Sequence, residues 1–172
     1  MIPDFKTYIG ESTWGGILDR GRGDAIKKED LIKDLYDKIT RDYGIGFINE
    51  DKIEYKDDYI HIPTFKILNM STYTSIEIKS DCISFFSLNV DAYKTMKREI
   101  NYIKNDLTNL YDKIKEKFSP EINTFDGMEH WIDFLVYFEK DATYEKCKEF
   151  IDFILNNITK KNPKIFLLLE KK

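Results

Sequence analysis

The sequence predicts an α+β fold, in which a mixed or antiparallel sheet of about five to seven strands packs against one long helix and two shorter helices. Three stretches place apolar residues at three- and four-residue spacing, and several shorter stretches alternate apolar with polar residues. The first 26 residues stand apart, because five of the eight glycines lie there. We therefore expect a Gly-rich N-terminal arm over 1–26 and a single α+β domain over 27–172.

The composition is that of one globular domain, with 172 residues, 42% hydrophobic and 34% charged. The net charge of −4 argues against general nucleic-acid binding, because such proteins normally carry a basic excess. No run approaches the ~18 consecutive apolar residues of a membrane span, so no membrane association is expected. Cys82 and Cys147 follow no metal or redox spacing, and no secretion signal precedes them, so we expect a reduced intracellular setting.

The arm leads directly into the first helix, which we expect over about 27–41. Its apolar residues fall on one face, and Gly44 just beyond them fits a C-terminal cap. This face consists of Leu31, Ile32, Leu35 and Ile39.

Strands follow the first helix. Residues 52–55 and 59–62 predict a hairpin that turns at 56–58, with Glu54 across from His61. Residues 74–79 alternate, whereas 82–88 are more continuously apolar, as in a central strand.

The long helix is expected over about 92–118, with Asp91 as its N-cap and Ser119-Pro120 at its end. Its apolar residues repeat at spacings of three and four, a heptad-like stripe. We favour a helix that lies along the sheet; the alternative is a homo-oligomer contact with a second chain through helix 92–118. The stripe consists of Tyr93, Met96, Ile100, Ile103, Leu107, Leu110 and Ile114.

The C-terminal part predicts a loop at 121–129, a strand at 130–140 inside the sheet, a helix at 144–159 and a last strand at 164–170. Thr143 is the expected N-cap of this helix. The buried face of the helix consists of Phe150, Ile151, Ile154, Leu155 and Ile158.

No motif for catalysis, metal binding or a cofactor emerges from the spacing, and we assign no catalytic residue, metal ligand or cofactor. Tyr8-Ile9-Gly10 followed by Arg20 resembles half of the GIY-YIG nuclease pattern, but no earlier strand carries the other half. His61 and His130 each lack a second ligand at a diagnostic spacing, so surface histidines are the better interpretation. Cys147 lies on the apolar side of its helix and is expected to be buried.

Residues 6–30 resemble the opening shared by short uncharacterised proteins of gut Bacteroidetes and their phages. That opening has a Lys-Thr-Tyr-Ile run, a Glu-Ser pair, a Trp-Gly pair, an Arg, a Gly and a basic residue before Glu-Asp. Gly16 departs from it, since an acidic residue is common there. The matching positions are Lys6, Thr7, Tyr8, Ile9, Glu11, Ser12, Trp14, Gly15, Arg20, Gly23, Lys28, Glu29 and Asp30.

The resemblance implies a docking segment, because a common opening on unrelated bodies behaves like a tag. Tyr8 and Trp14 suit pockets on a partner, and Glu11, Arg20 and Arg22 suit charge pairing that sets the register. The alternative is that this segment packs on its own domain, with Trp14 covering an apolar patch.

The sequence thus favours a non-catalytic phage or mobile-element protein that acts through protein–protein interaction. Its partner would be a virion component or a host enzyme, and its location the host cytoplasm or the virion. One alternative is an inhibitor or immunity protein that blocks a defence enzyme or toxin through an acidic and aromatic surface. Another is a nuclease-like enzyme centred on Tyr8 and Arg20.

Overall fold

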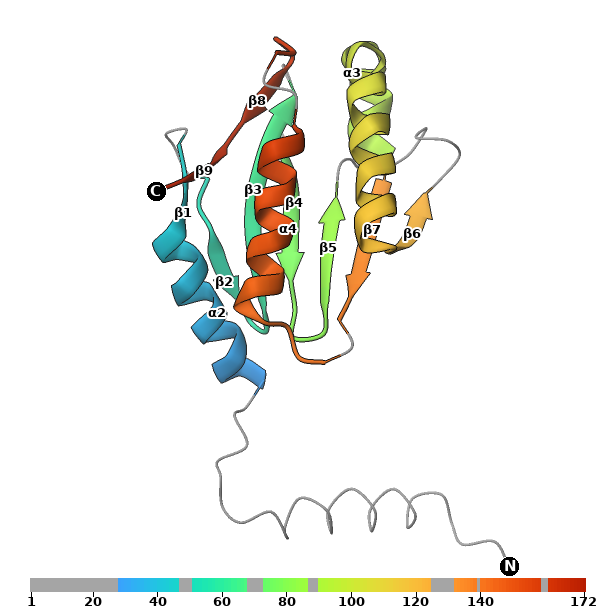
Figure 1. Cartoon of the computed structure of the whole chain (residues 1–172). Helices are drawn as coiled ribbons and strands as arrows, with labels where there is room; N and C mark the ends of the chain where they lie inside the picture. The colour runs from blue at the N-terminus through green and yellow to red at the C-terminus, as the bar shows by residue number, and fades with distance from the viewer. Residues whose placement is uncertain are drawn as a thin grey trace, which may run out of the picture.

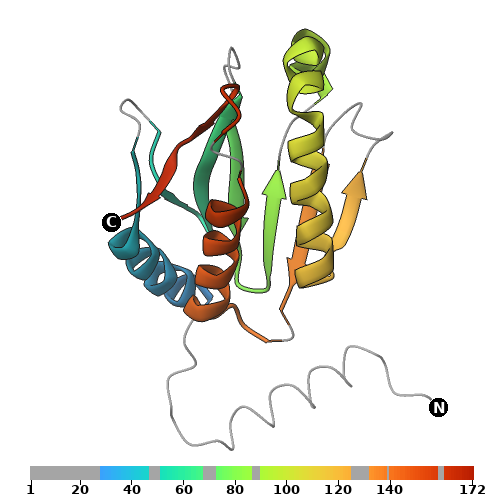
Figure 2. The same ribbon diagram turned by 45° about the horizontal axis from the view of Figure 1, so that its top comes forward.

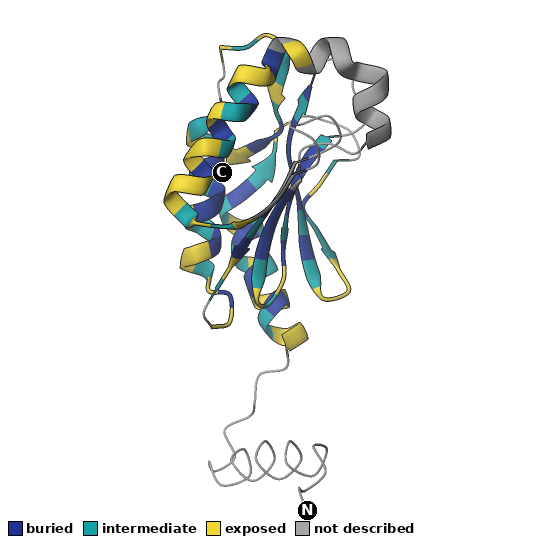
Figure 3. Ribbon diagram, turned by 90° about the vertical axis from the view of Figure 1, so that its right-hand side faces the viewer, coloured by how far each residue is buried: buried dark blue, intermediate teal, exposed yellow. Residues whose placement is uncertain are grey.

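The computed structural model describes residues 28–46, 51–67, 73–86, 90–124, 132–138, 140–158 and 161–172. Within these ranges, three helices lie on one face of an antiparallel sheet (Figures 1 and 3). The predicted α+β fold, with one long and two shorter helices, is therefore confirmed. The predicted N-terminal arm lies outside the described residues.

The main sheet has seven strands in the order β2-β3-β4-β5-β7-β6, and β8 pairs with β3 beside this path. Every pairing in it is antiparallel. A second sheet pairs β1 with β9. The strands are β1 (Tyr43–Ile45), β2 (Glu54–Lys56), β3 (Tyr59–Ile67), β4 (Tyr73–Ile78), β5 (Cys82–Phe86), β6 (Glu121–Thr124), β7 (Ile132–Tyr137), β8 (Ile165–Leu167) and β9 (Leu169–Lys171).

The three helices are α2 (Lys28–Asp42), α3 (Val90–Phe118) and α4 (Tyr144–Asn157). Figures 1 and 2 show α4 in front of β3 and β4, and α3 in front of β7. The N-cap predicted at Thr143 is confirmed, because its side chain accepts a hydrogen bond from the Lys146 amide at 3.3 Å. None of the helices in the described ranges is long and apolar enough to cross a bilayer.

The described part of the α3 stripe packs on its own sheet. Ile103, Leu107, Leu110 and Ile114 are each at most 5% exposed. The Tyr111 ring lies 4.9 Å from the Phe134 ring on β7. These residues therefore support the interpretation of a helix lying along the sheet, and they are not accessible to a second chain. The other stripe residues lie outside the described side chains.

Alternation along the strands builds the core on the helix-covered face. Phe65, Phe85 and Phe134 come from three strands, with ring centroids 6.3 Å and 5.8 Å apart between neighbours. All three rings are at most 2% exposed. The alternate side chains of each strand point to the opposite face, and most of them are polar or charged.

Some predicted details were wrong, and long-range strand pairing explains the first two differences. Gly44 is not a helix cap, because α2 ends at Asp42 and Gly44 pairs with Glu170 in β1. Residues 121–124 form a strand instead of a loop, since Glu121 pairs with Leu135. Asp91 lies inside α3, which begins at Val90.

The predicted last strand is divided at Leu168. Its amide donates a hydrogen bond to the Thr64 carbonyl at 2.8 Å, and its side chain is buried. Residues 165–167 therefore pair with β3 as strand β8, and residues 169–171 pair with β1 as strand β9. One continuous apolar run thus contributes a strand to each of the two sheets, and the alternation of residues in the sequence does not predict this division.

Candidate functional site

The five binding residues predicted from the sequence, Tyr8, Glu11, Trp14, Arg20 and Arg22, lie outside the described residues. His130 also lies outside them. The structure therefore neither brings these side chains together nor separates them. The candidate sites below are built from other side chains.

The junction between α2 and β1 forms a polar cluster with α4, which we call the Tyr–Asp clasp. Asp42 ends α2, and Tyr43 begins β1. Tyr144, Lys148 and Asp152 follow one another at four-residue spacing on α4, so they share one face of that helix. These five residues define the clasp.

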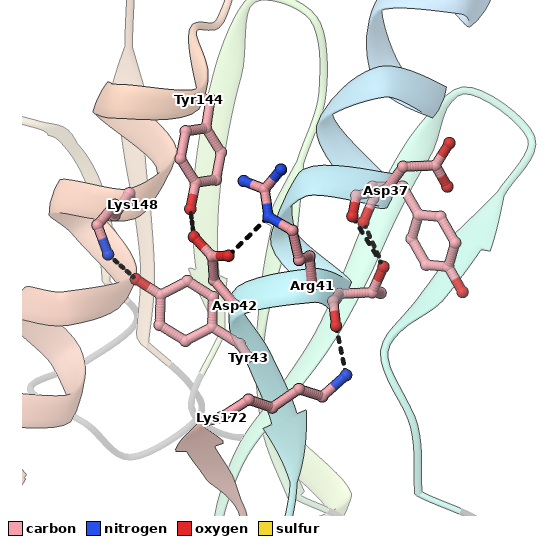
Figure 4. Close-up of polar contacts among 9 residues, drawn as sticks. Asp37, Arg41, Asp42, Tyr43, Tyr144, Lys148 and Lys172 are labelled. Carbon is pink, nitrogen blue, oxygen red and sulfur yellow. Dashed lines mark hydrogen bonds and ion pairs between the residues drawn. The ribbon is translucent and has the colours of Figure 1, made fainter.

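The clasp contains two reciprocal tyrosine–aspartate contacts, of which Figure 4 draws the one between Tyr144 and Asp42. The Tyr43 hydroxyl donates to Asp152 Oδ1 at 2.6 Å, and Lys148 Nζ donates to the same hydroxyl at 3.3 Å. In the opposite direction, the Tyr144 hydroxyl donates to Asp42 Oδ2. Each side of the junction thus supplies one donor and one acceptor.

Three cations contact the two aspartates of the clasp: its own member Lys148, and the neighbouring Arg41 and Lys171. Arg41 Nε lies 2.9 Å from Asp42 Oδ1, and Lys171 Nζ lies 2.9 Å from Asp152 Oδ1. Lys148 Nζ lies 3.5 Å from Asp152 Oδ2. Because Lys171 belongs to β9, the cluster ties together α2, α4 and the C-terminal strand.

The electrostatics of the clasp keep its protons in place. Burial, followed by the hydrogen bond to Asp152, raises the pKa of Tyr43. Burial acts to raise the pKa of Asp152 as well, but hydrogen bonds from Tyr43 and Lys171 outweigh it and lower that pKa. At neutral pH the tyrosine is a neutral donor and the aspartate an ionised acceptor. The clasp is therefore suited to holding elements together and not to moving protons.

The same pattern governs the second contact. Burial, followed by the hydrogen bond to Asp42, raises the pKa of Tyr144. Hydrogen bonds from Arg41 and then Tyr144 lower the pKa of Asp42. Neither half of the clasp therefore offers a general acid or base near neutral pH.

A groove of about 320 Å³ opens beside the clasp and shares Tyr43 with it. Its walls carry two carboxylates and two lysines, so it has no preference for a ligand of one charge. Gly46 lies so close to Glu170 that an added Cβ would be 2.5 Å from the Glu170 carboxylate. The lining residues are Thr40, Tyr43, Gly44, Ile45, Asp51, Lys52, Ile53, Glu170 and Lys172.

His61 lies on the face of the sheet opposite the helices. It pairs with Glu54 across β2, as expected, and its Nδ1 lies 3.7 Å from Glu77 Oε1. Its ring also lies 5.9 Å from the Tyr73 ring. Across the described ranges, no three His, Cys, Asp or Glu side chains are arranged to hold a metal ion.

Cys147 is fully buried, as its position on the helix predicts, and burial raises the pKa of its thiol to about 12. The clasp itself was missed by sequence reasoning. Its one local signal is the four-residue spacing of Tyr144, Lys148 and Asp152. The partner of Tyr144 lies 102 residues away in the chain, and the partner of Asp152 lies 109 residues away.

Three comparisons with known proteins complete the description of the chain. No family model, no curated protein and no solved structure matches it.

Proposed function

We propose that this protein is non-catalytic and acts by binding another protein, with residues 5–24 as the docking segment. One observation supports the first half of the proposal. Every clear pKa shift among the described residues moves the pKa further from pH 7. The pKa values of the shifted aspartates and glutamate are lowered, and those of the shifted tyrosines, cysteine, lysine and arginine are raised. Catalytic acids and bases normally shift toward the working pH.

The docking role rests on residue types in the first 27 positions. Tyr8 and Trp14 are large anchors of the kind that supply most binding energy in recognition segments. Glu11, Arg20 and Arg22 set the register through charge pairing. The resemblance of residues 6–30 to openings of proteins from gut Bacteroidetes and their phages points to a virion component or a host enzyme as the partner.

A second candidate is an inhibitor or immunity protein that binds a toxin or defence enzyme with its body. The observation in its favour is a surface with two exposed aromatic side chains, Tyr137 at 58% and Phe166 at 40% exposure, on an acidic chain. The two candidates differ in which part of the chain meets the partner.

The test uses the full chain as bait in lysate of phage-infected Bacteroidetes, followed by affinity measurement with the purified partner. Trp14→Ala combined with Arg20→Ala should weaken binding by about 100-fold or more, because each residue is a potential hot spot. Phe166→Ala is the matched control, which removes an exposed aromatic from the body and should leave affinity unchanged.

Three results would contradict the proposal. If the arm variant Trp14→Ala/Arg20→Ala binds the partner as tightly as the wild type, the contact lies in the domain over 27–172, and the inhibitor candidate is favoured. A large fall in the Tm of the arm variant would show that Trp14 packs on its own domain. Metal-dependent nucleic-acid cleavage that is lost in Tyr8→Phe would favour the nuclease-like candidate.

A further inference from the structure

The face of the main sheet opposite the helices carries its side chains in parallel rows, and two of these rows lie next to the β2–β3 and β4–β5 turns. The register of the strands defines both rows, because paired residues on adjacent strands lie side by side. The basic row consists of Lys56, Tyr59, Lys79, Cys82 and Tyr137. The acidic row, two residues further along each strand, consists of Glu54, His61, Glu77, Ser84 and Leu135, and it ends at Glu121 on β6.

The basic row carries two lysines, of which Lys79 alone lacks a carboxylate contact in the described ranges, and it has exposed aromatic surface. Lys79 is exposed and lies 6.0 Å over the Tyr59 ring, and it contacts no carboxylate within the described ranges. Lys56 lies 2.8 Å from Glu54 at one end of the rows. Tyr137 is 58% exposed at the other end.

The acidic row has a carboxylate beside each lysine of the basic row, Glu54 beside Lys56 and Glu77 beside Lys79. Glu77 keeps 25% of its side chain exposed, and its ion-pair contact in the described part of the chain is His61. Glu77 and Lys79 lie two residues apart near the end of β4, so this strand contributes one residue to each row. Each β4 therefore presents one carboxylate and one ammonium group on the same face.

We propose that this face binds a second copy of the same chain, face to face, about a two-fold axis that lies between the two rows and parallel to them. Rotation about this axis places the basic row of each copy over the acidic row of the other. Lys79 then meets Glu77 of the other copy, and the contact occurs twice. Tyr137 meets Leu135 in the same way.

Symmetry is the reason to prefer a second copy over another partner. An isologous contact requires a surface that is complementary to itself. Glu77 and Lys79, which lie on opposite sides of the axis at equal distances from it, have this property, and so do Glu54 and Lys56. Two sheets that pack face to face keep their strands within about 30° of each other, which preserves the match near β4.

The experiment is sedimentation-velocity centrifugation of the full chain over a concentration series, with circular dichroism as the check on folding. The wild type should form a dimer. Glu77→Lys and Lys79→Glu, tested separately, should each raise the dimer Kd by about 100-fold, because each puts two like-charge contacts in place of two ion pairs. The double variant Glu77→Lys/Lys79→Glu exchanges the rows at β4 and should restore the dimer.

A matched control exchanges charges on the helix side. Lys33 and Asp37 form an exposed pair on α2, with exposures of 52% and 60%. Lys33→Glu/Asp37→Lys should leave the dimer unchanged.

A monomeric wild type would overturn the proposal, as would single variants that still dimerise or a double variant that stays monomeric. The assay contains no other protein, so its outcome is independent of whether residues 5–24 dock to a partner.

Discussion

Removing the hydroxyl of Tyr43 tests whether the Tyr–Asp clasp stabilises the fold. Tyr43→Phe keeps the ring, which is fully buried, and deletes the donor that lies 2.6 Å from Asp152 Oδ1. A hydrogen bond to a charged group contributes about 1.5–3 kcal/mol. Asp152 keeps Lys171 at 2.9 Å after the change, so we expect a loss of about 2 kcal/mol in the free energy of unfolding. For a chain of this size that is a fall in Tm of roughly 4–8 °C.

The loss should depend on pH in a defined direction. The folded-state pKa of Asp152 is lowered, so its contribution to stability is present above its unfolded pKa of about 3.9. That contribution disappears as pH falls through the folded pKa. The folded-state pKa of Tyr43 is raised, so its contribution is present below the unfolded pKa of about 10 and is lost as pH rises through the folded pKa. The difference between Tyr43→Phe and wild type is therefore full at neutral pH and shrinks in acid.

Urea unfolding at neutral and acidic pH measures both effects. Tyr36→Phe is the matched control, because its hydroxyl donates to a neutral carbonyl, that of Ile53, at the longer distance of 3.4 Å. The control should lose less than about 1 kcal/mol. The reasoning is refuted if Tyr43→Phe loses no more than Tyr36→Phe, or if its loss is the same in acid as at neutral pH.

Three further predictions concern the helices. Leu110→Ala on α3, where Leu110 is 4% exposed, should lose about 2–5 kcal/mol in urea unfolding, whereas Asn109→Ala on the exposed face should lose less than about 0.5 kcal/mol; equal losses would contradict the burial of the stripe. Thr143→Ala should lose about 1 kcal/mol and Thr143→Ser should recover most of it, as unfolding of both variants will show. Cys147, whose pKa is raised to about 12 in a fully buried position, should resist iodoacetamide at pH values near 8 until the chain is unfolded. Peptide mapping that finds it alkylated in the native protein would contradict this.

Elements with a local signal were predicted from the sequence with close agreement. The helix after Thr143 was expected from its N-cap and from Phe150 and Ile154 on one face, and all three residues have the expected place. The hairpin between β2 and β3 was expected from its turn, where Asp57 adopts a φ of 51°. Both signals lie within a few residues of the structure that they produce.

The strands β1 and β6 had no such signal. They are three and four residues long, and each exists because a distant segment pairs with it. Tyr43 pairs with Lys171, and Glu121 pairs with Leu135. The candidate site was beyond prediction for the same reason, since the contact of Asp42 with Tyr144 joins residues 102 positions apart.

The pairing of β1 with β9 also sets the order in which the chain acquires its structure. The amide of Lys172 donates to the Asp42 carbonyl at 3.0 Å, and Lys172 Nζ donates to the Thr40 carbonyl. The end of α2 is therefore secured by residues that the ribosome adds about 130 positions later. Contacts of such long range form late, since loop closure must precede them. During synthesis the C-terminal end of α2 therefore stays without these contacts until residues 169–172 are free to pair with it.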